Sequence, residues 1–319
     1  MAEIRAPPVE VDLGAAVGHE RRRKARKYLV LYVFCLIPAT VLFIFHYLPI
    51  WGVVIAFKDF RVGLGILGSP WNDFEHFRDL FLDPFFPRVL RNTVIISLLK
   101  IVFGFPAPVI LALLLNELRN QPFKKAVQSI SYLPHFMSWV VIAGVVMEIL
   151  SPQRGIPAYI GHLFGAEEVP NLFLDRTLFR PLLVVTHIWQ SVGWGTIVYL
   201  AALSTVDPTL YDVSAVDGAG RLRTMAHITL PALVPVMTIL FLLSLGHLLN
   251  AGFEQIFNLY NPLVYEVADI IDTYVYRVGI LDSRFEFGAA VGLFKNVIGV
   301  ILLVAANAII RRFSEYAIW

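Results

Sequence analysis

The chain alternates long apolar runs with short polar segments, and the apolar runs define its class. A membrane-crossing helix needs about 20 predominantly apolar residues. About six windows meet this requirement. They are residues 29–56, 92–115, 131–150, 181–204, 230–250 and 288–310. The pattern predicts an all-α, polytopic transmembrane helical bundle of about six spans, with loops and tails between them.

Composition agrees with a protein embedded in lipid. Of 319 residues, 57% are hydrophobic and 16% charged, and the mean hydropathy is +0.69. Ordinary soluble domains carry about 25% charged residues. The first window is longer than the roughly 7–15 apolar residues of a signal peptide and has no small-residue cleavage site after it, so we expect it to stay in the protein. The predicted domains are a basic tail over residues 1–28 and one transmembrane domain over residues 29–319.

Charge predicts the orientation of the bundle. The basic block Arg21–Lys27 precedes the first span, and the positive-inside rule places it in the cytoplasm. With an even number of spans, both termini are then cytoplasmic. The near-neutral net charge of +2 conceals basic inner segments and acidic outer loops. A basic tail also occurs in nucleic-acid-binding proteins, but no aromatic interleaving or reader motif accompanies this one, so we expect lipid and no nucleic acid as its partner.

The polar segment 207–231 lies between two apolar windows and has readable local chemistry. Asp207 suits a helix N-cap and Pro208 the first helical position. We predict a helix from Pro208 toward Val216, a reversal at Asp217-Gly218, and a second helical stretch from Ala219 through Arg221 and Arg223. The product is a two-helix knob. An ordinary interhelical turn explains the same spacing equally well.

The register of this segment resembles the "EAA" cytoplasmic loop of permease subunits of binding-protein-dependent ABC importers. That loop follows the pattern E-A-A-x3-G-x9-I-x-L-P. Gly218, Ile228, Leu230 and Pro231 fall in register, whereas Asp212-Val213-Ser214 replaces the leading E-A-A. The stretches 193–196 and 199–203 resemble the branch that imports oligo- and polysaccharides, and within it the first permease of a bacterial alginate importer.

The resemblance implies a fold, a function and a set of partners. The fold is that of a type I ABC importer permease with a cytoplasmic coupling helix in segment 207–231. The function is import of an oligosaccharide, acidic and alginate-like, from periplasm to cytoplasm across the bacterial inner membrane by alternating access. The implied partners are a second homologous permease, two ABC ATPase subunits and a periplasmic or lipid-tethered solute-binding protein.

The chain is not expected to be an enzyme. No lysine follows a glycine, so the phosphate-binding Gly-Lys-Ser/Thr step is missing, and we expect no cofactor here, with ATP and Mg²⁺ bound by the partner ATPases. The resemblance assigns the ATPase-coupling surface to segment 207–231. Its expected residues are Tyr211, Asp212, Asp217, Gly218, Ala219, Arg221, Arg223, Leu230 and Pro231.

Polar and aromatic residues inside the windows indicate a substrate path, since they are costly in lipid and usually face a bundle interior. A sugar offers apolar C–H faces and many hydroxyl groups, so its site combines aromatic rings with amides. If the sugar is a uronate, cations such as Lys295 add to the site. The candidates are Trp194, Tyr199, Asn250, Lys295 and Asn296. Interfacial aromatic belts and interhelical hydrogen bonds are the competing interpretation.

The other motifs in the sequence do not indicate a nucleotide or metal site. The run Gly63–Gly68 matches G-x-G-x-x-G but lacks the strand and helix of a dinucleotide site, and the eight histidines form no metal motif, so no metal is expected. The main alternative function is an ion-gradient-driven secondary transporter. That class needs intramembrane acids, and the six windows contain only Glu148, near the edge of its window. A membrane-embedded enzyme is a further alternative without a catalytic constellation.

Overall fold

A computed structural model describes residues 13–165 and 169–313, which form helices joined by turns; within these ranges there is no β-strand, only an isolated bridge between Lys58 and Trp71. The chain divides into two compact units, one ending at Val54 and one beginning at Ile55. Residues 1–12 of the predicted basic tail and residues 314–319 lie outside the described residues. The boundary at residue 28 and the cytoplasmic location of the termini therefore stay predictions.

The first unit carries the first expected span. Helix α1 (Leu13–Leu42), a π-helix (Phe43–Tyr47), α2 (Leu48–Ile50) and a 3-10 helix (Trp51–Phe57) follow one another without a break. The apolar part, Lys27–Phe57, has the length and composition to cross a membrane. This agrees with the expected window 29–56.

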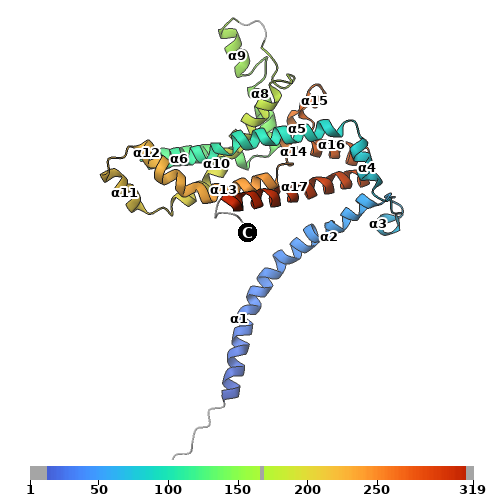
Figure 1. Ribbon diagram of the computed structural model, residues 1–319, viewed down its shortest axis with the longest axis horizontal. Coiled ribbons are helices and arrows are strands. Elements are labelled where there is room, and N and C mark those ends of the chain that lie inside the picture. Colours follow the sequence, from blue (N-terminus) through green and yellow to red (C-terminus); the bar gives the residue numbers. More distant parts are fainter. Residues whose placement is uncertain (1–12, 166–168, 314–319) are drawn as a thin grey trace, which may run out of the picture. The chain divides into compact units, whose positions relative to one another are not determined.

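The second unit contains the remaining helices, whose longest members correspond to the other apolar windows (Figure 1). Its α-helices are α3 (Gly65–Gly68), α4 (Glu75–Leu82), α5 (Phe86–Leu99), α6 (Pro106–Glu117), α7 (Gln121–Tyr132), α8 (Trp139–Ile149), α9 (Ile156–Leu163), α10 (Phe179–Leu203), α11 (Pro208–Val216), α12 (Arg221–Thr224), α13 (Leu230–Gly246), α14 (Phe253–Leu259), α15 (Tyr265–Ala268), α16 (Ile271–Val275) and α17 (Phe285–Phe313). Short π or 3-10 turns join them at Lys100–Gly104, Leu133–Phe136, Met225–Thr229, Pro262–Val264 and Tyr276–Leu281.

Four helices of the described residues are long and apolar enough to cross a membrane, or five if one bent pair counts as a span. Besides the first, three of them are Phe86–Glu117, Arg221–Gly246 and Phe285–Arg312. Helix α10 has 25 residues, enough to cross, but falls outside this group because polar residues such as His187 and Gln190 interrupt its apolar sequence.

The third expected span, 131–150, differs from a straight helix. The segments Gln121–Phe136 and Trp139–Ile149 meet at an angle of 111°. Ser138 caps α8 by accepting a hydrogen bond from the Val141 N–H at 3.4 Å, so a new helix begins at the bend. Helix α8 alone has 11 residues, too few to cross a bilayer unaided.

The long helices of the second unit pack side by side. Helix α10 contacts α6, α7 and α13, and α13 contacts α17. In Figure 1, α11 and α12 lie at one end of these helices and α4 at the other. The polar segment predicted to couple to an ATPase is therefore at the end of the bundle opposite α4.

Three groups of buried apolar side chains hold this unit together. The first joins α8 and α10 to the segment that follows α13, through residues such as Ile142, Leu183 and Ile256. Ile256 and Val264 are completely buried. Residues 251–271 therefore fold back into the core.

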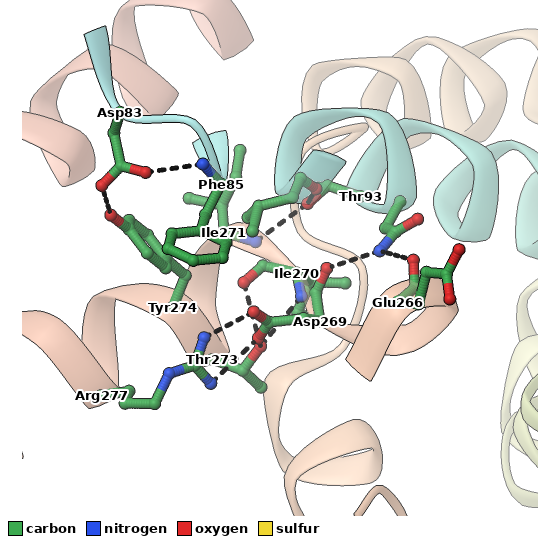
Figure 2. Close-up of polar contacts among 12 residues, drawn as sticks. Asp83, Phe85, Thr93, Glu266, Asp269, Ile270, Ile271, Thr273, Tyr274 and Arg277 are labelled. Atoms are coloured by element: carbon green, nitrogen blue, oxygen red, sulfur yellow. Dashed lines mark hydrogen bonds and ion pairs between the residues drawn. The ribbon is translucent and has the colours of Figure 1, made fainter. Parts of the chain in front are cut away.

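Hydrogen bonds fix this returning segment to α5 (Figure 2). The Asn92 amide nitrogen donates to the carbonyl oxygens of Glu266 (3.0 Å) and Asp269 (3.1 Å). The Thr93 hydroxyl oxygen accepts from the Ile271 N–H at 2.9 Å. The bonds to Asp269 and Ile271 are buried, so each of them satisfies a backbone group that water cannot reach.

Candidate functional site

The polar segment 207–231 begins with the predicted helix. The Asp207 carboxylate accepts the Thr209 N–H at 2.9 Å and caps α11, whose first residue is Pro208. Hydrogen bonds from the backbone and side chain of Thr209 lower the pKa of Asp207. The predicted bounds of this helix, Pro208 to Val216, are confirmed.

The chain reverses at Gly218, as expected. Its φ of +73° lies in the left-handed region, and the Ala219 N–H closes the turn by donating to the Ser214 carbonyl at 3.0 Å. The second half of the expected knob differs, because α12 is not a separate short helix. It continues through a π turn into α13, so Arg221 already belongs to the candidate span Arg221–Gly246.

Side-chain hydrogen bonds hold α11 against this continuous helix. The hydroxyl groups of Ser214 and Thr224 are 2.6 Å apart, and those of Tyr211 and Thr229 are 3.4 Å apart. Ser214 and Thr229 are buried. Direct side-chain contacts therefore join α11 to the helix that leads into α13.

The outer surface of the loop combines charge with exposed apolar side chains. The charged residues Asp212, Asp217, Arg221 and Arg223 are exposed, as is Pro231. Tyr211, Ala219 and Leu230 are half-buried and belong to the support of the loop. The sequence did not predict the exposed apolar residues of this surface. They are Val213, Val216 and Leu222, of which Val216 is 88% exposed. Apolar residues on a short helix are more often core, so no sequence signal distinguished them.

A cavity of about 380 Å³ lies between α5, α10 and the returning segment. This is within the range of ligand pockets, roughly 300–1,000 Å³. Its polar and aromatic lining comprises Ser97, Lys100, Phe105, Trp139, His187, Gln190, Ser244 and Gln255, together with His247 and Asn250.

Lys100 is the buried cation of this cavity. Its Nζ donates to the Ala251 carbonyl oxygen at 2.6 Å and to Gln255 Oε1 at 2.5 Å. The Gln255 amide nitrogen in turn donates to the Leu183 carbonyl and to the Thr186 hydroxyl, each at 2.7 Å. One hydrogen-bond chain thus joins the middle of the Phe86–Glu117 span, α14 and α10.

A second cavity of about 370 Å³ contains three of the sequence-predicted path residues, Asn250, Lys295 and Asn296. Lys295 Nζ forms an ion pair with Asp272 at 2.5 Å, so its charge is already compensated. Asn250 also lines the first cavity and a third one of about 510 Å³. The structure therefore brings these three residues together around neighbouring cavities.

The other two predicted path residues lie elsewhere. Tyr199 is 2% exposed and packs in the apolar cluster of α6, α10 and α13. Trp194 stacks on His135, with ring centroids 4.6 Å apart and planes at 4°. Neither lines the three cavities above. All five path assignments stay predictions.

Lys100 and Gln255 were not among the residues proposed from the sequence, and the structure shows them hydrogen-bonded to each other in the 380 Å³ cavity. Lys100 lies inside an apolar window, which is a signal for function, since charges are rare within spans. Gln255 lies between the apolar windows 230–250 and 288–310, where no span was predicted. Its importance follows only from contacts with residues about 70 and 155 positions away.

A bundle of membrane-crossing helices with polar-lined cavities and an exposed polar loop at one end is the architecture of a membrane transport subunit. The chain belongs to the family of binding-protein-dependent transport system inner membrane components, whose pattern matches residues 104–315. It is therefore a multi-pass transport component of the inner membrane, as expected. Membership gives no support to the alternative of an ion-gradient-driven secondary transporter.

Known proteins are similar over nearly the whole chain. The polygalacturonan/rhamnogalacturonan transport system permease protein YteP of Bacillus subtilis (strain 168) is 43% identical over 326 residues, covering 100% of this chain and 99% of that protein. Protein LplB of the same organism is 44% identical over 303 residues, covering 95% and 94%.

Solved structures confirm the fold. A chain from a bacterial ABC transporter involved in the import of the acidic polysaccharide alginate has 38% identity and a TM-score of 0.82, covering 93% of this chain and 100% of that chain. A chain from a bacterial alginate ABC transporter in complex with an alginate pentasaccharide-bound periplasmic protein gives the same TM-score and identity, with 93% and 99% covered. The predicted type I ABC importer permease fold is thereby confirmed.

Proposed function

We propose that this chain is the permease subunit of an ATP-driven importer that carries an acidic oligosaccharide from the periplasm to the cytoplasm. The observation that carries the proposal is similarity over nearly the full length to proteins whose names specify polygalacturonan/rhamnogalacturonan and alginate. Polygalacturonan and alginate are both polymers of uronic acids. The polar-lined cavities among the spans offer the amides, aromatic rings and cations that such a sugar requires.

The proposed complex contains a second similar permease, two ABC ATPase subunits that bind ATP and Mg²⁺, and a periplasmic or lipid-tethered binding protein. Both termini and segment 207–231 face the cytoplasm. The exposed Asp212, Val216 and Arg223 contact an ATPase subunit, and its motion reaches α13 through the hydroxyl contact of Ser214 with Thr224. Rigid-body movement of α11 then opens the cavities to alternate sides of the membrane.

Reconstitution tests this function directly. The complete transporter in liposomes should accumulate trigalacturonate only when ATP is enclosed on the ATPase side and the binding protein is outside. Maltotriose, a neutral trisaccharide, serves as the comparison and should enter much more slowly. Accumulation of trigalacturonate driven by an ion gradient without the ATPase subunits would contradict the proposal.

Replacing Gly218 with valine should uncouple ATP hydrolysis from uptake. A Cβ added at this position would meet no atom within 4 Å, so the expected effect comes from the positive φ, which costs an L-residue about 1–2 kcal/mol. We expect several-fold more ATP hydrolysed per sugar imported, with the thermal unfolding midpoint of the bundle close to that of the unmodified protein.

Gly220 provides the matched control for this substitution. It also has open space around it, but its φ of −70° and ψ of 161° suit valine. Gly220→Val should keep the ratio of ATP hydrolysed to sugar imported near that of the unmodified protein. If the ratio of ATP hydrolysed to sugar imported is similar in the two variants, the left-handed turn at Gly218 is not required for coupling.

A further inference from the structure

The 380 Å³ cavity contains a cation without an anionic partner. None of its lining residues is an aspartate or glutamate. Among the ion pairs found within residues 13–165 and 169–313, none involves Lys100. The two acceptors of its Nζ, the Ala251 carbonyl and the Gln255 amide oxygen, are both neutral. A buried charge held only by neutral groups is costly unless something else compensates it.

The position of the ammonium group is fixed by its surroundings. Lys100 is 8% exposed, and a Cβ added at Gly252 would lie 2.7 Å from its Nζ. Gln255, which accepts one of its hydrogens, is itself held by two hydrogen bonds to α10. An ammonium group has three donors, and two are used here, so one remains for a further acceptor at the cavity wall.

A second buried group lacks a partner in the same wall. Ser97 is 4% exposed and its hydroxyl oxygen makes no hydrogen bond. It lies three residues before Lys100, so the two side chains share one face of the helix. Unsatisfied buried polar groups are uncommon, and each indicates a missing water, ion or ligand. Ser97 and Lys100 together offer the donors that a carboxylate accepts.

Lys295, the other lysine that lines these cavities, differs from Lys100 because it has an anionic partner. Lys295 already pairs with Asp272. A carboxylate arriving at Lys295 would have to compete with an existing anion, whereas one arriving at Lys100 would meet an uncompensated charge. Lys100 therefore replaces Lys295 as the candidate for recognising an acidic sugar.

We infer that Lys100, with Ser97 beside it, binds a carboxylate of the transported sugar and thereby makes the permease selective for uronate over neutral oligosaccharides. The inference rests on the proposed function and adds to it a specificity-determining residue within the permease. The carboxylate oxygen accepts the remaining Nζ–H of Lys100 and the hydroxyl hydrogen of Ser97. Trp139 in the same lining offers an aromatic face to the sugar ring.

The test compares two probes with the same sugar backbone, trigalacturonate and its fully methyl-esterified form, in which every carboxylate is a neutral ester, in liposomes containing the complete transporter. In Lys100→Gln the uptake of trigalacturonate should fall about tenfold or more, the scale of one lost hydrogen bond between charged groups. Uptake of the ester should fall much less, so the preference for the acid decreases. Lys100→Arg keeps the charge and should recover part of the uptake.

Lys125 is the matched control, because it is an exposed lysine on α7, away from the cavity lining. Lys125→Gln should leave the uptake of both probes unchanged. Uptake of trigalacturonate by Lys100→Gln at the rate of the unmodified protein would overturn the inference. An equal loss of uptake and of basal ATP hydrolysis would also overturn it, since Lys100 would then be structural. If the unmodified transporter imports neither probe, the proposed function itself fails.

Discussion

Replacing Gly193 with alanine should severely destabilise the protein. Gly193 lies on α10 where that helix touches the backbone of α7, and an added Cβ would lie 2.1 Å from the Ser131 carbonyl oxygen and 2.3 Å from its carbonyl carbon. No rotamer change relieves a collision between two backbones, so one helix must move. We expect a loss at or above the upper end of the roughly 1–3 kcal/mol typical of overpacking.

The measurement is the thermal unfolding midpoint and the monodisperse yield of the transporter in detergent. Gly144→Ala on α8 is the control, because a Cβ there meets no atom within 4 Å. That variant should be neutral or slightly stabilising, since alanine favours helices more than glycine does. If both variants unfold at the temperature of the unmodified protein, the close approach of α7 and α10 at Gly193 is not required for stability.

The second large effect is expected at Asp269, which fixes the segment that folds back into the core. Its carboxylate is 1% exposed and accepts hydrogen bonds from Arg277 Nη2 at 2.5 Å and from the Thr273 hydroxyl at 2.8 Å (Figure 2). Asp269→Asn keeps the shape but removes the charge, which leaves the Arg277 guanidinium unpaired. Because that group is 31% exposed, we expect a loss near the lower end of the roughly 3–5 kcal/mol seen for broken buried pairs.

The unfolding midpoint in detergent again gives the measurement, and an exposed ion pair with one partner on the same segment gives the control. Arg176 and Glu266 form an ion pair with side chains 58% and 54% exposed. Glu266→Gln should change stability by no more than about 1 kcal/mol, because water screens exposed charges. Equal effects of the two substitutions would contradict the assignment of Asp269 as an anchor.

Arg277 also lies over the ring of Tyr265, with its guanidinium carbon 5.0 Å from the ring centroid. Nearby, burial and a hydrogen bond to Asp83 raise the pKa of the Tyr274 phenol. These contacts join the C-cap residue of α4 to α15, α16 and the π turn that carries Arg277. Asp269, which lies between α15 and α16, therefore supports this network as well as the two short helices beside it.

The membrane-crossing helices could be predicted because their cause is local. A run of about 20 apolar residues is favourable in lipid whatever its neighbours are, provided that its backbone hydrogen bonds are made within the helix. The window 29–56 accordingly corresponds to Lys27–Phe57, and the window 288–310 to Phe285–Arg312. The cap at Asp207 and the left-handed Gly218 were predictable for the same reason, since each depends on a few adjacent residues.

The bend after α7 and the contents of the cavities were not predictable in this way. The window 131–150 has the composition of one span, yet the chain turns by 111° within it. Tyr199 and Asn250 were both predicted to line the substrate path. Tyr199 is buried in the core, whereas Asn250 lines three cavities. Composition cannot distinguish these positions, because the face that a residue presents depends on which helices surround its own.

The sequence by itself determined the class of the protein, the location of most spans and the register of the loop that resembles a coupling helix. Each follows from hydropathy or hydrogen bonding over fewer than about 30 neighbouring residues. Only the tertiary structure decided that Lys100 lacks an anion and that Lys295 has one. The hydrogen-bond partners of Lys100 lie 151 and 155 positions away along the chain, and the ion-pair partner of Lys295 lies 23 positions away. Contacts over such separations depend on how whole helices pack, which local patterns do not specify.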